Sequence, residues 1–214
     1  MRSLLALFIL ATAAGFALGQ GSAAAGLSDL ELAIGQNFET AVSRDADARK
    51  YMLTFVDPAF FARTSKLRKL WGRASVVDGE TLIIGGERVR LYGVKAPDIS
   101  QTCSERTLNL QFDAGGFALG RLKTWARGDK AVVCYVEQVQ PAQGTCFTWG
   151  LVGPMNLARL LVREGAVWAS PPNTSPYVRD EGWAEGVASR DKDPTTKNLW
   201  HTDCQPPWKQ PSSR

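Results

Sequence analysis

The cysteines and the one histidine are the residues of this chain best suited to nucleophilic or metal chemistry. The four cysteines, Cys103, Cys134, Cys146 and Cys204, include no Cys-x-x-Cys pair, the spacing common in zinc and redox sites. His201 is the single histidine among 214 residues. One histidine excludes a His-rich metal cluster and disfavours a Ser-His-Asp triad. The cysteines are therefore interpreted first as structural residues.

The first residues have the pattern of an export signal. Arg2 precedes an uninterrupted run of apolar and small residues over positions 4–18. Ala17-Leu18-Gly19 then supplies the small-x-small pattern that signal peptidases accept, and Ala23-Ala24-Ala25 supplies a second one. We expect a signal peptide over residues 1–19, an exported protein that is periplasmic or secreted, and no membrane span after cleavage. A retained membrane anchor is the alternative.

In an oxidising compartment, four cysteines favour two disulfides over free thiols or a metal site. Residues 132–136 and 146–149 are both typical of β-strands, and residues 141–144 supply a turn between them. A bridge across that hairpin would join Cys134 to Cys146 and leave Cys103 to pair with Cys204. Four cysteines permit three connectivities, so the other pairings and four buried thiols stay open.

Two further groups of residues could bind a polymer. Five basic residues fall within eleven positions that contain no acid, namely Arg63, Lys66, Arg68, Lys69 and Arg73. They indicate either a patch for nucleic acid or an acidic polysaccharide, or a solvated face. The seven tryptophans could stack on bases or sugars, although most are expected in the core. A net charge of +4 does not by itself favour nucleic acid.

Residues 20–70 are expected to form a flexible and helical N-terminal extension. Residues 20–27 are rich in Gly, Ala and Ser, and Ser28-Asp29-Leu30-Glu31 has the pattern of a helix capping box. Apolar residues then recur at helical spacing, which predicts a helix from Asp29. Pro58 interrupts a second, shorter helical stretch.

From Trp71 the pattern changes to short β-rich segments at 73–77, 81–84 and 88–94, separated by the turn signals Asp78-Gly79 and Gly85-Gly86. Helices are predicted over 104–127, over 155–165 with Gly165 as its end, and over 177–190. The order of three strands, a helix, two strands and further helices predicts an α+β domain. Its centre would be a five-stranded OB-type β-barrel over residues 71–208, followed by a tail at 209–214.

These segments resemble the thermonuclease (staphylococcal-nuclease-like) family. Residues 75–84 (SVVDGETLII), 89–98 (VRLYGVKAPD) and 101–103 (QTC) are similar to the family's V-x-D-G-D-T, R-L-x-G-I-D-A-P-E and Q-x-C segments. Residues 112–122, residues 156–168 and the pairs Leu199-Trp200 and Pro207-Trp208 resemble its later motifs. The resemblance covers residues 71–208 and implies the same OB-fold barrel with flanking helices.

The resemblance also implies a site for calcium-dependent phosphodiester hydrolysis. In the family, two aspartates and a backbone carbonyl hold Ca²⁺, a glutamate helps to activate water, and two arginines bind the phosphate. Glu80 takes the position of the first metal ligand, Arg90 that of the first arginine, and Asp98 that of the glutamate. Ala96 takes the carbonyl position. Lys95 replaces the second ligand aspartate, and Thr145 replaces the second arginine.

Lys95 decides what we expect of this site. At 4 Å and an effective dielectric constant near 20, an ammonium opposes a divalent cation by about 8 kcal/mol. The ammonium could instead pair with Glu80 or Asp98. We therefore expect no cofactor and a degenerate site in a monomeric binding or accessory protein, similar to the nuclease-like proteins of succinoglycan (exopolysaccharide) biosynthesis. The alternative is a weak secreted nuclease that hydrolyses DNA or RNA with Ca²⁺ or another metal through Glu80, Asp98 and Arg90.

Overall fold

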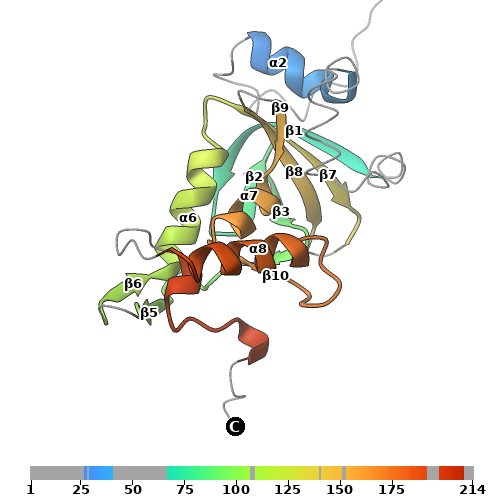
Figure 1. Cartoon of the computed structure of the whole chain (residues 1–214). Coiled ribbons are helices and arrows are strands. Elements are labelled where there is room, and N and C mark those ends of the chain that lie inside the picture. The colour runs from blue at the N-terminus through green and yellow to red at the C-terminus, as the bar shows by residue number, and fades with distance from the viewer. Residues whose placement is uncertain are drawn as a thin grey trace, which may run out of the picture.

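The computed structural model describes residues 27, 29–40, 67–106, 109–139, 141–150, 153–191 and 198–209 (Figure 1). The predicted signal peptide, Ser28 of the capping box, the stretch around Pro58, and Arg63 and Lys66 of the basic group lie outside these residues. None of the helices in the described ranges combines the length and the apolar character that crossing a bilayer requires.

A closed β-barrel is the centre of the described part of the chain, as the sequence predicts. Its strands are β1 (Arg68–Val76), β2 (Thr81–Ile84), β3 (Glu87–Leu91), β7 (Ala131–Glu137) and β8 (Gln143–Gly150). Antiparallel pairing joins β3 to β2, β2 to β1, β1 to β7 and β7 to β8. A short parallel pairing, with Arg90 opposite Gln143 and Leu91 opposite Gly144, closes the ring between β3 and β8. This mixed barrel matches the predicted OB-type architecture.

Helices and shorter strands surround the barrel, which confirms the α+β class. The helices are α2 (Asp29–Gln36), α6 (Ala114–Trp125), α7 (Leu157–Arg163) and α8 (Val178–Ala188), with 3-10 turns η1 (Leu199–His201) and η2 (Pro207–Lys209). The shorter strands are β4 (Val94–Lys95), β5 (Thr102–Ser104), β6 (Gln111–Asp113), β9 (Gly153–Asn156) and β10 (Trp168–Ala169). β9 adds to the sheet beside β8, β4 pairs with β10, and β5 pairs with β6. In Figure 1, α2 lies at one end of the barrel and α8 at the other.

Two predicted helices begin later than expected because strands precede them. Residues 102–104 and 111–113 pair as β5 and β6, so the helix predicted over 104–127 begins only at Ala114. Asp113 Oδ1 accepts a hydrogen bond from Gly116 N there. Asn156 Oδ1 caps α7 in the same manner by accepting from Arg159 N, and residues 155–156 belong to β9. A side-chain cap, rather than the apolar period, sets the first residue of each helix.

The alternation of side chains along β1, β7 and β8 separates two cores. Inward-facing residues such as Val132, Cys134 and Val136 join the barrel interior. The intervening residues Val133, Tyr135 and Phe147 form a second cluster that Phe38 of the N-terminal extension completes, with Trp71 and Trp149 packed against it. Phe38 is 1% exposed, and its ring centroid lies 5.5 Å from that of Phe147. The described part of the extension is therefore packed onto the outer face of the barrel.

Polar contacts also hold this extension. The Glu39 carboxylate accepts a hydrogen bond from the Tyr135 hydroxyl at 2.6 Å and pairs with Lys69 Nζ at 2.9 Å. Burial acts to raise the pKa of Glu39, but the hydrogen bonds from Tyr135 and Lys69 outweigh it and hold the pKa below its ordinary value. These bonds stabilise the docked segment at neutral pH, above the pKa of the unfolded chain, and their contribution is lost as the pH falls through the folded-state pKa.

Both disulfides of the predicted pairing are present. Cys134 and Cys146 are fully buried at opposite register positions of β7 and β8, with their Cα atoms 4.0 Å apart. Cys103 and Cys204 join β5 to the segment after η1, across 101 positions of sequence. Two disulfides are typical of a protein that folds in an oxidising compartment.

The start of α6 packs closely against the backbone of residues 98 and 99, and a glycine makes this possible. A Cβ on Gly115 would lie 2.2 Å from the Asp98 carbonyl oxygen and 2.4 Å from that of Ile99. A Cβ on Gly120, in the same helix, would meet nothing within 4 Å. The two glycines therefore offer a matched pair of substitutions.

We expect Gly115→Ala to lower the free energy of unfolding by about 1–3 kcal/mol, because the helix and the loop must move apart. Gly120→Ala should leave it unchanged or raise it by up to about 1 kcal/mol, since alanine favours the helix. Urea denaturation of both variants measures the difference. Equal stabilities would contradict the close packing at Gly115.

Candidate functional site

A cavity of about 360 Å³ opens beside the barrel at the turn after β1, at β4 and at the loop that follows β4. Its lining consists of Val77, Asp78, Glu80, Arg88, Lys95, Ala96, Pro97, Asp98 and Ile99. Four of the positions that the thermonuclease-like resemblance identifies, Glu80, Lys95, Ala96 and Asp98, thus lie around one cavity. They come from segments that are separated by up to 18 residues in the sequence.

Glu80 is the buried carboxylate of this cavity, with 5% of the residue exposed. Its Oε1 accepts hydrogen bonds from Arg90 Nη2 at 2.7 Å and from Lys95 Nζ at 3.2 Å. Its Oε2 accepts the backbone N–H of Ala96 at 2.6 Å. One carboxylate therefore pairs with two cations, so this group of three side chains has a formal net charge of +1.

The turn between β1 and β2 places Glu80. Asp78 Oδ1 accepts the backbone N–H of Glu80, and the Glu80 carbonyl accepts the N–H of Leu91 on β3. A Cβ on Gly79 would lie 2.6 Å from Ala118 Cβ and 2.8 Å from Ala96 Cβ. Only glycine lets the turn approach α6 and the β4 loop this closely, so Gly79 brings the carboxylate next to its three donors.

Strand β4 presents Lys95, and the C-terminal half of the domain holds β4 in place. Lys95 and Val94 pair with Trp168 and Ala169 of β10. The carbonyl of Gly93, immediately before β4, accepts hydrogen bonds from Ser175 Oγ at 2.6 Å and from Ser170 N at 2.9 Å. The position of the ammonium thus depends on residues that follow it by more than 70 positions.

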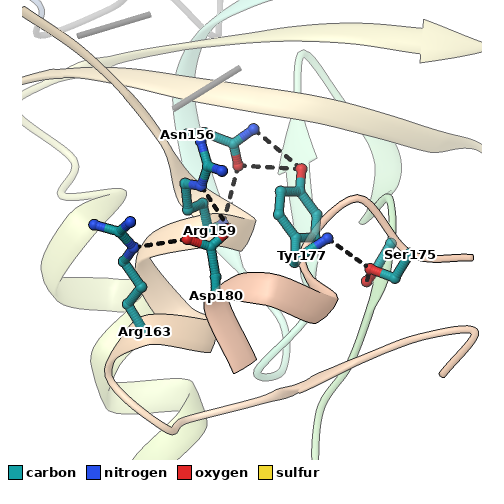
Figure 2. Close-up of polar contacts among 7 residues, drawn as sticks. Asn156, Arg159, Arg163, Ser175, Tyr177 and Asp180 are labelled. Carbon is teal, nitrogen blue, oxygen red and sulfur yellow. Dashed lines mark hydrogen bonds and ion pairs between the residues drawn. The ribbon is translucent and has the colours of Figure 1, made fainter. Parts of the chain in front are cut away.

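A buried polar network holds Ser175 in place for its contact with the Gly93 carbonyl (Figure 2). Ser175 Oγ accepts the N–H of Tyr177, and the Tyr177 hydroxyl lies 3.0 Å from Asn156 Nδ2. Burial raises the pKa of Tyr177 to about 12, so its hydroxyl stays protonated and can donate to Asn156 Oδ1. The network links the start of α7 to the segment that contacts Gly93.

An ion-pair group beside this network fastens α7 to α8. Asp180, 3% exposed, accepts hydrogen bonds from Arg159 Nε at 2.7 Å and from Arg163 Nε at 2.8 Å, as Figure 2 shows. The two arginines lie one helical turn apart on α7 and thus reach the same carboxylate. The sequence motifs do not predict the network or the ion pairs. Of the residues involved, only Asn156 stands at a motif position, as the first residue of the segment at 156–168.

Arg88 is a cavity residue that the sequence analysis does not identify. It lies two positions before Arg90 on β3 and therefore on the same face of the strand. Asp98 is exposed and is one of the residues that line the cavity. The period of two along β3 could have identified Arg88, because residues two positions apart on a strand lie side by side on the same face and Arg90 was already a candidate.

Thr145 and the basic group lie elsewhere. Thr145 stands opposite Tyr135 on β8 and is not among the described residues that line the cavity. Arg68 pairs with Glu87, Lys69 pairs with Glu39, and Arg73 Nε donates to the Gly128 carbonyl. The described members of the basic group are therefore engaged in internal contacts. Among the described residues, the cations that line the cavity are instead Arg88 and Lys95, and Arg90 adjoins it through its contact with Glu80.

The residues around Glu80 do not fit a calcium ion. Calcium takes six to eight oxygen ligands, whereas both oxygens of Glu80 already accept N–H donors and the Lys95 ammonium lies 3.2 Å from one of them. Over the described ranges, no group of three or more His, Cys, Asp or Glu side chains is placed to hold a metal ion.

No family model matches this chain, and a search of curated proteins gives no match. The thermonuclease-like resemblance rests on the motifs in the sequence, and the OB-type barrel is compatible with it.

Calcium is expected to leave the melting temperature of the wild-type protein unchanged, because Lys95 repels the ion and both Glu80 oxygens are engaged. Lys95→Asp removes the ammonium and adds a carboxylate between Glu80 and Asp98. At ten times its dissociation constant, Ca²⁺ should raise the melting temperature of this variant by about 3–6 °C. Differential scanning calorimetry with Ca²⁺ or a chelator provides the measurement.

Lys123→Asp is the matched control for this experiment, because Lys123 is exposed on α6 and lies outside the cavity lining. It should show no response to Ca²⁺. A calcium-dependent rise in the wild-type protein would show that the donor set accepts the metal after all.

Proposed function

We propose that this protein is an exported, non-catalytic binding or accessory protein, a degenerate relative of the thermonucleases whose cavity binds an anionic group of a polymer without a metal. The observation that carries the proposal is the sharing of the Glu80 carboxylate by Arg90 and Lys95. Where the resemblance implies Ca²⁺, the chain supplies its own cations.

The cations around the cavity retain the capacity to bind an anion. An arginine has five N–H donors and a lysine has three, and Glu80 engages only part of them. The side chains of Arg90 and Lys95 are 37% and 30% exposed, so they remain accessible while salt screens them less than fully exposed charges. Arg88 adds a further cation at the lining. A single carboxylate or phosphodiester group would compensate the excess charge on Arg90 and Lys95.

The same contacts argue against phosphodiester hydrolysis. Catalysis requires preorganised cations that stabilise the charge developing on the phosphate in the transition state. Here Glu80 already compensates part of the charge of Arg90 and Lys95, and Thr145 stands at the position of the second arginine. Asp98 is one methylene shorter than the glutamate that it replaces.

The proposed ligand is an acidic polysaccharide, and a role in exopolysaccharide (succinoglycan) biosynthesis follows from the resemblance. The two disulfides support an oxidising compartment, and the proposed location is the periplasm or the exterior. The protein is proposed to act as a monomer. Nucleic acid would offer similar anionic groups, so the binding experiment below includes it.

A weak secreted metal-dependent nuclease that acts through Glu80, Asp98 and Arg90 is the second candidate, because Glu80 and Asp98 line one cavity and Arg90 contacts Glu80. Incubation of the mature protein with denatured DNA and RNA tests it, in Ca²⁺, in other divalent ions and in chelator. We expect no hydrolysis above that of a Glu80→Gln control. Metal-dependent cleavage that the control lacks would overturn the non-catalytic proposal.

Binding to immobilised polygalacturonate and to single-stranded DNA, at low salt and in chelator, tests the proposed ligand class. We expect polygalacturonate to bind, and Lys95→Met and Arg90→Met to weaken its binding about tenfold, the equivalent of one charged hydrogen bond. Lys123→Met should bind as the wild type does. Equal binding by the Lys95 and Lys123 variants would contradict a role for the cavity, and binding of DNA alone would contradict the polysaccharide ligand.

A further inference from the structure

The Cys103–Cys204 disulfide lies next to a loop that lines the cavity. The loop of residues 96–101, here called the cavity wall, connects β4 to β5, and Pro97, Asp98 and Ile99 on it face the cavity. Cys103 is on β5, two residues after the wall ends. The backbone carbonyl of Gln101 accepts N–H bonds from Ala114 and Gly115, which attaches the end of the wall to α6.

The side chain of Gln101 connects the disulfide to the cavity wall. Its Oε1 accepts the backbone N–H of Asp98 at 3.2 Å, and its Nε2 lies 3.9 Å from the sulfur atoms of both Cys103 and Cys204. The two sulfur atoms act as weak acceptors that hold the amide in this orientation. One side chain therefore relates the position of Asp98 to the bridge.

A second connection reaches the opposite side of the site. Cys103 and Cys204 pack in an apolar cluster with Phe112, Leu199 and Trp168. Trp168 is the register partner of Lys95 in the pairing of β10 with β4. The disulfide thus packs against Trp168, which pairs with Lys95, and lies next to the loop that carries Asp98.

The two disulfides differ in their accessibility and in what depends on them. Cys134 and Cys146 are 0% exposed inside the barrel, whereas Cys103 and Cys204 are each 8% exposed in a separate apolar cluster. Backbone contacts also join the C-terminal segment to β5 and its neighbour, since Asp203 N donates to the Ser104 carbonyl and Arg106 N donates to that of His201. These backbone contacts and the core of the barrel do not require the Cys103–Cys204 disulfide. Its loss should therefore loosen this region without opening the barrel.

We propose that the Cys103–Cys204 disulfide positions Asp98 and Lys95 in the cavity and makes ligand binding there dependent on redox state. A dithiol reductant would transfer two electrons and two protons to the bridge, which gives two thiols, and would itself be oxidised to a disulfide. Gln101 then loses its pair of fixed acceptors, and the cavity wall moves more freely. The effect on ligand binding rests on the proposed function, whereas the effect on the cavity wall does not.

Amide hydrogen exchange of the full mature chain, followed by mass spectrometry, tests the effect on the wall. We expect residues 96–101 to exchange about tenfold faster after reduction by dithiothreitol and in the double variant Cys103→Ser/Cys204→Ser, with residues 131–137 of β7 unchanged. Unchanged exchange at 96–101 once the bridge is gone would overturn the proposal. Equal acceleration of β7 would overturn it as well, because the bridge would then stabilise the whole domain.

Gln101→Ala separates the connection from the bridge itself. This variant keeps both disulfides and should reproduce the faster exchange at Asp98, whereas Gln111→Ala, at an exposed position of neighbouring β6, should not. Normal exchange at Asp98 in Gln101→Ala would contradict the transmission through this side chain.

Polygalacturonate binding by the oxidised and reduced proteins completes the test. We expect reduction to weaken binding about tenfold, and equal affinity despite a loosened wall would overturn the redox dependence. If the oxidised protein does not bind the polymer at all, the proposed function fails, and the exchange experiment still decides whether the bridge positions the cavity wall.

Discussion

The buried carboxylate of Glu80 is the interaction on which the geometry of the cavity depends. A carboxylate removed from water is costly unless it is paired and hydrogen-bonded, and Glu80 meets both conditions through Arg90, Lys95 and the N–H of Ala96. Each donor belongs to a different segment, namely β3, β4 and the cavity wall. The need of one buried carboxylate for partners therefore brings together the three segments that line or adjoin the cavity, and Lys95, at the position of a metal ligand in the resemblance, is one of these partners.

The surrounding structure exists largely to keep these segments in register. Gly79 and Gly115 allow the β1–β2 turn and the cavity wall to approach α6 at distances that any side chain would prevent. From the other side, the contacts of Ser175 and Tyr177 hold the Gly93 carbonyl, and Asp180 holds α8 against α7. Preorganisation of this kind lowers the entropic cost of binding an anion.

The N-terminal extension solves a separate problem of the barrel. Strands β1, β7 and β8 carry apolar residues on both faces, so the outer face also needs cover. Phe38 covers this face, and the Glu39 carboxylate accepts a hydrogen bond from the Tyr135 hydroxyl and pairs with Lys69. Desolvation and the bond to Glu39 raise the pKa of Tyr135, which keeps this hydroxyl a hydrogen-bond donor. The barrel thus has two cores of different origin, one closed by its own strands and one by a segment that precedes them.

Local patterns in the sequence are sufficient for the strand segments and the glycine turns, because period-2 alternation and left-handed turn residues act over a few positions. Gly85 and Gly86, both at positive φ, are examples. Local patterns favour the hairpin disulfide, the buried Cys134–Cys146 pair, but leave the other pairings open. The motifs also indicated Glu80, Lys95 and Asp98. The predicted start of α6, at residue 104, is too early, because the helical spacing of apolar residues extends upstream to residue 108. The pairing of β5 with β6 and the cap by Asp113 delay the helix to Ala114.

Tertiary structure alone decided which charges meet. Whether Lys95 pairs with Glu80 or Asp98, whether Arg88 reaches the cavity and whether the basic residues after position 67 are free depend on contacts between segments up to 55 residues apart. The same holds for Gln101, whose side chain touches a sulfur atom 103 positions away. The sequence determines the residue types and their local conformation. The partner of each charge depends on how the barrel closes, because electrostatic and hydrogen-bond energies depend on distance in space rather than along the chain.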